Sequence, residues 1–197
     1  EAAVAGARLP GHVRRIDAPG IRAVKLIDAT PIGVNVRSTV ATYSGVHDDL
    51  RRLFARTADA KAKGLKAGDF SYNTGRLRCP CCDGTGVVSL DVQFLPDVEI
   101  ECPQCRGSRY AREAGEARTA SGLSMPGLMA ADVSTARRLL ADEKGAKTVL
   151  ERLATLDALG LGYLALGEET PGLSGGEAQR LKLSGELGRG QADSVFV

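Results

Sequence analysis

Four cysteines of this sequence fall into two pairs, Cys79 with Cys82 and Cys102 with Cys105, each spaced as C-x2-C. The 19 residues between the pairs complete the spacing of a closed structural zinc site, in which two chain segments together supply four thiolates. Disulfides would need an oxidising compartment, and no stretch of the sequence resembles a signal peptide. We therefore predict one structural Zn²⁺ on these four cysteines, with Cys81 as the alternative to Cys82 in the ligand set.

The segment between the cysteine pairs has the pattern of a β-hairpin. Apolar and polar residues alternate over 88–94, which is the period of a strand with one buried face. Residues 95–97 (Leu-Pro-Asp) predict a turn, and the alternation resumes over 98–102. Tight turns that aim backbone N–H groups at the sulfurs are favoured by three glycines after the cysteine pairs, Gly84, Gly86 and Gly107.

The N-terminal third combines a strand with a helix. An apolar run at 21–27 predicts a buried strand, and one apolar face predicts a helix over 45–57. A stretch rich in Lys, Gly and Ala at 60–68 predicts a linker. The apolar run at 194–197 predicts a second strand at the other end of the sequence.

Helical periodicity dominates the sequence after residue 124. Ser134 predicts the N-cap of a short helix over 134–140. A longer helix is predicted over 146–159, stopped by Gly160, and a last one over 176–187. The fold class that follows is α+β: a mainly helical domain with an inserted, zinc-stapled β-hairpin module.

Charge does not single out a partner for the whole chain. The sequence has 26 Lys and Arg residues against 24 Asp and Glu, a net charge of +2. Residues 51–66 are locally basic, so they could meet phosphates, or they could form a solvated helix face followed by a flexible loop. No apolar run has the length of a transmembrane helix, so we expect a cytoplasmic protein with no membrane partner.

A second strong motif is Leu-Ser-Gly-Gly-Glu-Ala-Gln-Arg at 173–180. It sets a serine and two glycines at a predicted helix start, where exposed, free N–H groups and the helix dipole favour a phosphate. The octet resembles the signature of ATP-binding-cassette (ABC) ATPases, whose loop contacts the γ-phosphate of ATP held by the facing domain. This resemblance implies a nucleotide contact in trans by Ser174, Gly175, Gly176, Glu177 and Gln179.

Together with the cysteine pairs, several further stretches resemble one family, the UvrA proteins of the bacterial excinuclease ABC. These stretches are 30–33, 37–38, 41–45, 68–73, 93–97, Tyr110 and 159–163. The Phe-Leu-Pro-Asp run within 93–97 is typical of the second, C-terminal ATPase half of the family. The resemblance implies three regions: 1–68, a strand and helix following the Q-loop; 69–112, the zinc-binding hairpin module; and 113–197, a helical signature domain ending before Walker B.

The family resemblance also implies an activity and partners. It implies a DNA-stimulated ATPase, using ATP and Mg²⁺, that recognises damaged double-stranded DNA in nucleotide excision repair. The implied protein partners are a second ATPase half, a second copy in a homodimer, and an excision-repair helicase subunit. This sequence contains no Walker A motif, and the Walker B acidic pair should follow the strand at 194–197. We therefore expect this segment alone to hydrolyse no ATP, and we assign no catalytic residue.

Two alternatives are open. Ala29 stands where the family usually has the Q-loop glutamine, which raises the alternative of a UvrA-like paralogue that confers drug resistance or protects DNA. Residues 79–86 also fit the C-x-x-C-x-G-x-G repeat of DnaJ-type chaperones, which would make the module a polypeptide-binding one. That class uses four repeats, whereas here there are two and the second departs at 108–109.

Contact with DNA would use basic side chains in and before the cysteine module. Residues 69–112 contain five arginines against six acidic residues, and four thiolates add negative charge, so the module is not basic overall. The alternative is that zinc acts only as a rigid strut. The candidate DNA-binding residues are Arg51, Arg52, Lys61, Lys63, Arg76, Arg78, Arg106 and Arg109.

Overall fold

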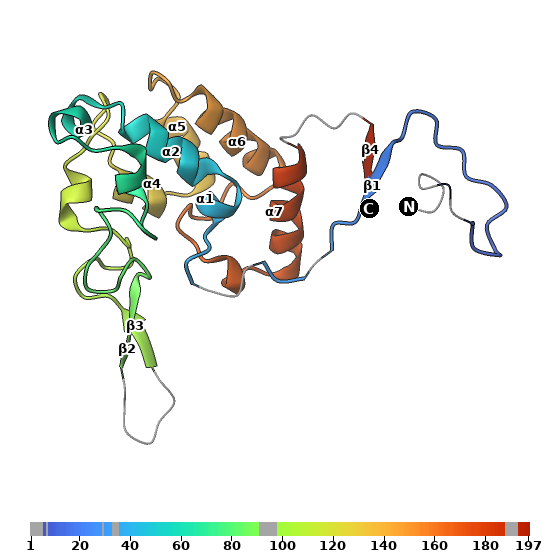
Figure 1. Ribbon diagram of the computed structural model, residues 1–197, viewed down its shortest axis with the longest axis horizontal. Coiled ribbons are helices and arrows are strands. Elements are labelled where there is room, and N and C mark those ends of the chain that lie inside the picture. Colours follow the sequence, from blue (N-terminus) through green and yellow to red (C-terminus); the bar gives the residue numbers. More distant parts are fainter. Residues whose placement is uncertain (1–5, 7, 29, 33–35, 91–97, 188–192) are drawn as a thin grey trace.

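The computed structural model describes residues 6, 8–28, 30–32, 36–90, 98–187 and 193–197, and shows a body of short helices that carries two separate strand pairs (Figure 1). The helices are α1 (Val40–Tyr43), α2 (Val46–Phe54), α3 (Ala58–Ala62), α4 (Met125–Ala130), α5 (Val133–Leu139), α6 (Lys147–Ala158) and α7 (Gly175–Leu187). Three 3₁₀ turns are η1 (Ala67–Phe70), η2 (Arg112–Gly115) and η3 (Thr170–Gly172). The strands are β1 (Ala23–Lys25), β2 (Val87–Leu90), β3 (Val98–Glu101) and β4 (Ser194–Phe196).

The main hydrophobic core lies among the helices, where apolar residues at helical spacing face one another. The predicted helix over 45–57 is α2, and its Val46, Leu50 and Phe54 are fully buried. The predicted helix over 146–159 is α6, which buries Leu153 and Leu156 in the same core. Each such side chain contributes about 1.5–3 kcal/mol when it is removed from water. This packing forms the helical body to which the cysteine module and the octet at 173–180 are attached.

Strands β1 and β4, from the N-terminal and C-terminal parts of the sequence, pair in a small parallel sheet beyond α7 (Figure 1). Ala23 pairs with Ser194 and Lys25 with Phe196. Strand β1 is shorter than the predicted strand over 21–27, and it is half-buried rather than buried, because the pair is covered by few neighbours. An ion pair between Lys25 and Glu186 ties this sheet to α7.

The hairpin between the cysteine pairs is present as β2 and β3, which project from the helical body (Figure 1). The strands are antiparallel, with Val88 opposite Ile100 and Leu90 opposite Val98. The prediction of one buried face is wrong for both strands: β3 is exposed along its whole length, and Leu90 of β2 is exposed like its polar neighbour Ser89. The predicted turn at 95–97, and with it the rest of 91–97, lies outside the described residues.

Two local predictions need correction. The predicted linker at 60–68 overlaps the end of helix α3 and the start of turn η1, because Ala60 and Leu65 are buried against the core and the Thr57 hydroxyl caps α3. Helix α5 is capped by Asp132, whose carboxylate accepts the N–H of Thr135 at 2.7 Å, and not by Ser134. A carboxylate at the N-cap also complements the helix dipole.

The architecture is mixed helix and sheet. The range 69–112 contributes to two hydrophobic clusters: its cysteines form a small one, while Phe70, Tyr72 and Tyr110 belong to the main helical core. The hairpin module is therefore anchored in the body at its base. Among the residues that the structure describes, no helix is both long and apolar enough to cross a membrane.

Candidate metal centre and signature loop

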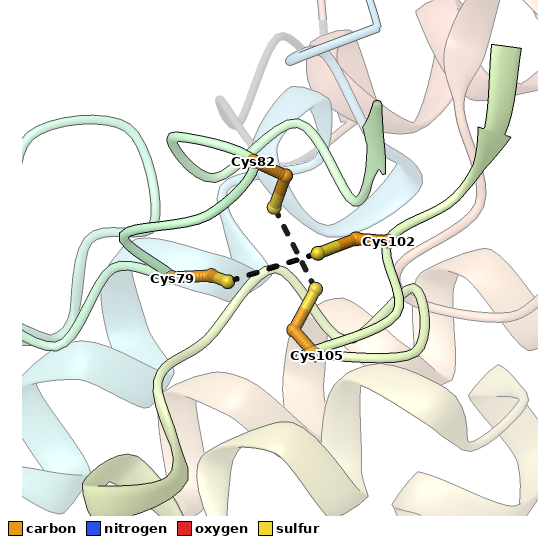
Figure 2. A group of neighbouring side chains, drawn as sticks. All are labelled: Cys79, Cys82, Cys102 and Cys105. Atoms are coloured by element: carbon orange, nitrogen blue, oxygen red, sulfur yellow. Dashed lines mark hydrogen bonds between the residues drawn. The ribbon is translucent and has the colours of Figure 1, made fainter. Parts of the chain in front are cut away.

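The sulfurs of Cys79, Cys82, Cys102 and Cys105 converge on one point between the base of the hairpin and the helical body (Figure 2). All four Sγ atoms lie within 4.8 Å of one another, with 4.0 Å between Cys79 and Cys102 and 3.6 Å between Cys82 and Cys105. Tetrahedral zinc with Zn–S bonds of about 2.3 Å requires S–S separations of roughly 3.8 Å. The four thiols therefore fit a closed Cys₄ zinc site.

Each cysteine pair and the turn that follows it form a knuckle, at residues 79–84 and 102–107, and the two knuckles have the same backbone form. After Cys82, Asp83 (φ 51°) and Gly84 (φ 79°) are left-handed, and after Cys105 the same holds for Arg106 (φ 49°) and Gly107 (φ 71°). This double left-handed turn folds the chain back over the sulfurs. The N–H of Gly86 donates to the Cys82 sulfur at 3.3 Å, the kind of contact that stabilises a thiolate ligand.

Glycine is required at position 84 for a second reason. A Cβ on Gly84 would lie 1.8 Å from the carbonyl oxygen of Tyr72, so no other residue fits without displacing backbone. The close approach brings the first knuckle onto the residue that anchors the module in the core.

The thiols are electrostatically unequal. Burial raises the pKa of Cys79, and burial also raises the pKa of Cys105 well above its ordinary value. Burial acts in the same direction on Cys102, but hydrogen bonds from the backbone N–H groups of Cys105 and Gln104 and from the thiols of Cys105 and Cys81 together outweigh it. They lower the pKa of Cys102 to about 6. Cys81 is exposed and its sulfur is not one of the four that converge.

The signature residues begin α7, as predicted from the octet. The Glu177 carboxylate accepts the N–H of Ser174 at 2.7 Å and its hydroxyl at 2.6 Å, and the Ser174 Oγ accepts the N–H of Glu177 at 3.4 Å. The prediction that the Ser174 N–H is free is therefore wrong, because this capping box uses it. Gly175 and Gly176 are exposed.

Two other residues around the loop have defined partners. The Tyr163 hydroxyl donates to the same Glu177 carboxylate. The hydrogen bond from the Ser174 side chain is the largest cause that lowers the pKa of Glu177, and the one from Tyr163 is the next. The Gln179 side chain instead donates to the carbonyl oxygen of Ile27 at 2.7 Å, so in this chain it joins α7 to the segment that follows β1.

The candidate DNA-binding residues differ in their surroundings. Lys61 and Arg106 are exposed. Arg109 is only 4% exposed, so the prediction that it contacts DNA is wrong; its guanidinium is used inside the protein. The other five are ion-paired: Arg51 with Asp48, Arg52 with Asp49, Lys63 with Glu116, Arg76 with Asp69 and Arg78 with Asp83.

Sequence reasoning missed the aromatic cluster that joins the cysteine module to α2. His47 Nε2 lies 2.9 Å from the Tyr110 hydroxyl, which itself donates to the Phe70 carbonyl at 2.9 Å. The Tyr72 ring lies 4.8 Å from the His47 ring and edge-on to Tyr110. The signal in the sequence is the position of Phe70, Tyr72 and Tyr110 just inside the two ends of the range 69–112, in a chain with only four Phe and four Tyr. Ala29, at the Q-loop position, lies outside the described residues.

Comparison with known proteins gives a consistent result. The chain is 45% identical over 166 residues to UvrABC system protein A of Synechocystis sp., which is 84% of this chain and 17% of that protein. It is 40% identical over 186 residues to UvrABC system protein A of Streptomyces avermitilis, covering 93% of this chain and 18% of the relative. The chain thus spans about a fifth of the length of these curated relatives. No family model matches the sequence.

A solved structure matches in three dimensions as well. The crystal structure of UvrA2 from Deinococcus radiodurans superposes with a TM-score of 0.79 and 42% sequence identity, over 91% of this chain and 22% of that one. Both the sequence and the fold of the described residues therefore correspond to one segment of these proteins.

Proposed function

The chain belongs to the UvrA family, and we propose that it supplies the signature loop and a structural zinc module to an ABC-type ATPase of nucleotide excision repair. The single observation that carries this proposal is the geometry at 173–180. An exposed pair of glycines opens a helix of 13 residues, and a serine hydroxyl stands directly before them. This arrangement suits a phosphate group that arrives from another domain.

ATP would be held by a Walker A loop outside this segment, with Mg²⁺ at its phosphates. Gly176 would offer its N–H and Ser174 its hydroxyl to the γ-phosphate, while Glu177 releases Ser174 from the capping box. Gln179 would hold α7 in place through its hydrogen bond to the carbonyl oxygen of Ile27. We therefore assign these residues to completing an ATPase site in trans, and the chain alone is expected to hydrolyse no ATP.

A zinc ion on Cys79, Cys82, Cys102 and Cys105 would be structural. Four sulfurs close a tetrahedral shell and leave no position for water or substrate, so the ion supplies rigidity and not Lewis-acid chemistry. It would fix the base of the β2–β3 hairpin against the helical body. The region 69–112 is thus proposed to be a zinc-binding hairpin module within the signature domain.

The longer protein is proposed to bind damaged double-stranded DNA as a homodimer, to act with an excision-repair helicase subunit, and to work in the cytoplasm. Within this segment the candidate side chains best placed for phosphate contact are those exposed to solvent. These are Lys61, Arg106, Arg52, Lys63 and Arg76, of which the last three also form ion pairs. Removing any one of these cations should weaken binding to all DNA sequences equally and reduce its salt dependence.

A second candidate is a UvrA-like paralogue that protects DNA from drugs, favoured by Ala29 at the Q-loop position. Expression of the longer protein in a bacterium that lacks its own UvrA tests the two. Restored survival after ultraviolet irradiation supports excision repair. If the cells survive a DNA-binding antibiotic but not ultraviolet irradiation, the result supports the paralogue. If they survive neither treatment, the result contradicts the proposal.

A further inference from the structure

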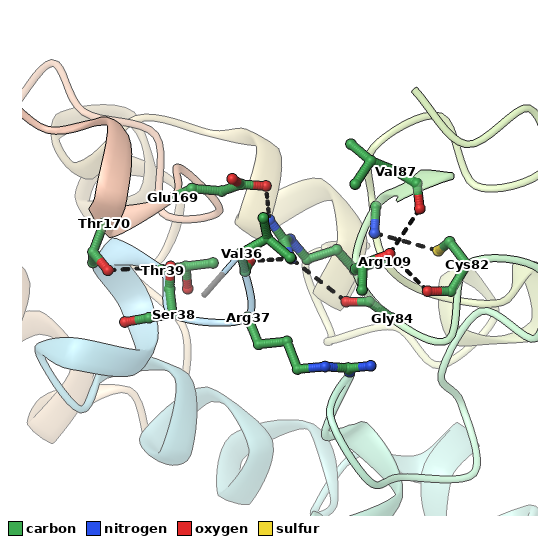
Figure 3. A network of polar contacts seen from close by, with 12 residues as sticks. Val36, Arg37, Ser38, Thr39, Cys82, Gly84, Val87, Arg109, Glu169 and Thr170 are labelled. Atoms are coloured by element: carbon green, nitrogen blue, oxygen red, sulfur yellow. Dashed lines mark hydrogen bonds and ion pairs between the residues drawn. The ribbon is translucent and has the colours of Figure 1, made fainter. Parts of the chain in front are cut away.

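Arg109 joins the cysteine knuckles to the loop that precedes the signature helix (Figure 3). Its backbone carbonyl accepts the N–H of Cys79 at 3.0 Å, which holds it to the first knuckle. Its guanidinium donates to the Glu169 carboxylate at 2.7 Å and to the carbonyl of Val36 at 2.7 Å. We propose that Arg109 is a positioning residue through which metal on the four cysteines fixes the conformation of the signature loop.

The side chain of Arg109 is held in a single place. It is 5% exposed, and its guanidinium carbon lies 5.4 Å from the centre of the Tyr72 ring. A buried guanidinium is costly without a partner, so it cannot leave Glu169 without finding another anion. Its backbone is left-handed (φ 69°), a conformation that a non-glycine residue keeps only where its surroundings impose it. Here those surroundings are the second knuckle, which the metal would lock.

The other end of this contact leads directly to the signature. Glu169 forms an antiparallel bridge with Thr39, and the next residue, Thr170, donates its N–H to the Ser38 carbonyl at 2.9 Å. The 3₁₀ turn η3 then carries the chain to Ser174, five residues after Glu169. Because only this short, hydrogen-bonded turn separates the two residues, a displacement of Glu169 would also move Ser174, the capping serine of α7. The contact between Arg109 and Glu169 therefore links the second knuckle to the signature loop across 60 residues of sequence.

This inference rests on the proposed metal site and not on ATP hydrolysis, so its test uses neither nucleotide nor DNA. Hydrogen exchange is measured at the N–H groups of Thr170 and Leu173, in the zinc-loaded chain and after removal of zinc by a chelator. The variants are Glu169→Gln, which keeps the shape of the side chain and removes its charge, and Arg106→Gln as control. Arg106 is an exposed arginine of the same knuckle with the same left-handed backbone.

We expect zinc removal to speed exchange at Thr170 and Leu173 at least about tenfold in the unaltered chain and in Arg106→Gln. In Glu169→Gln, exchange there should already be fast with zinc bound, and chelation should change it little. Chelation could unfold the whole chain, which a loss of protection in α6 would reveal. In that case the test is the exchange rate at Thr170 and Leu173 in zinc-loaded Glu169→Gln, compared with that in the zinc-loaded unaltered chain. Equal exchange in those two, a zinc response confined to residues 79–107, or a chain that takes up no zinc would each overturn the proposal.

Discussion

The Glu177 carboxylate holds both the N–H and the hydroxyl of Ser174, so the serine of the signature loop is already occupied by an anion from its own helix. This capping box stabilises the first turn of α7, and it places a negative charge at the positive end of the helix. A phosphate that binds the loop must displace this carboxylate. The hydrogen bond from Tyr163 gives the displaced carboxylate a second partner on the same side of the loop.

The first prediction concerns this cap. Glu177→Ala should destabilise the start of α7 by about 1 kcal/mol, because two donors of Ser174 lose their acceptor. Hydrogen exchange of the α7 backbone measures the effect. Glu151→Ala, at an exposed position within α6, is the control and should leave α7 unchanged. Unaltered protection of α7 in Glu177→Ala would show that the box contributes nothing.

A second prediction concerns the metal. Elemental analysis should find one zinc per chain, and Cys102→Ser should lose it, because a three-thiolate site binds zinc far more weakly. Exchange should then become fast in β2 and β3, while α6 keeps its protection through the separate helical core. Cys81→Ser is the control and should retain full zinc. Retention of zinc by Cys102→Ser would contradict our ligand set, and loss of zinc from Cys81→Ser would place Cys81 in it instead of Cys82.

A third prediction separates backbone strain from steric contact. Gly64 and Gly84 both have a positive φ (63° and 79°), but a Cβ at 64 meets no atom within 4 Å whereas at 84 it meets the Tyr72 carbonyl. Gly64→Ala should cost about 1–2 kcal/mol of unfolding free energy. Gly84→Ala should cost at least about 3 kcal/mol more, or prevent folding. Denaturant titration of both variants measures the difference, and similar midpoints would contradict the close approach.

Much of the secondary structure could be predicted from local pattern. The cysteine spacing, the octet and the apolar faces of α2 and α6 each lie within a short stretch, so the sequence alone identifies them. The cap at Asp132 shows the limit of this approach, because several polar residues near a helix start can serve as its cap and only the structure selects one.

The contacts that join the two motifs could not be predicted. Basic residues near a cysteine module usually face solvent, so local pattern predicts a surface position for Arg109, whose partner Glu169 is 60 residues away. Similarly, local pattern predicts a linker in place of helix α3, because the single buried alanine of this helix gives almost no periodic signal. Tertiary burial, not local propensity, determines both.

A fourth prediction concerns pH. His47 is buried, and burial lowers its pKa from 6.5 to about 4. Between pH 6.5 and 4 the unfolded chain therefore binds a proton that the folded chain does not, so His47 favours folding above pH 6.5 and this contribution falls as the pH decreases to 4. The loss amounts to about 3 kcal/mol.

Denaturant titration between pH 7 and 4 isolates this effect by comparison of variants. His47→Gln should be less stable at pH 7, because it loses its ring contact with Tyr72, yet its stability should depend less on pH than that of the unaltered chain. His12→Gln, at the other histidine, which is exposed, is the control for the substitution of a histidine. Parallel pH curves for His47→Gln and the unaltered chain would contradict the assignment.

The central claim is that the loop at 174–176 completes an ATPase site, and Gly176→Asp in the longer protein tests it most directly. A side chain at 176 meets no atom of this chain within 4 Å, and an aspartate in the first turn of a helix is not destabilising, so folding and zinc content should be unchanged. Gly172→Asp adds the same charge in equally open space just before the loop and is the control.

The measurement is the rate of DNA-stimulated ATP hydrolysis. We predict a loss of about a hundredfold or more for Gly176→Asp and little change for Gly172→Asp, because only the former sets a carboxylate against the γ-phosphate. Full turnover by Gly176→Asp would reduce the octet to a helix cap and contradict the account.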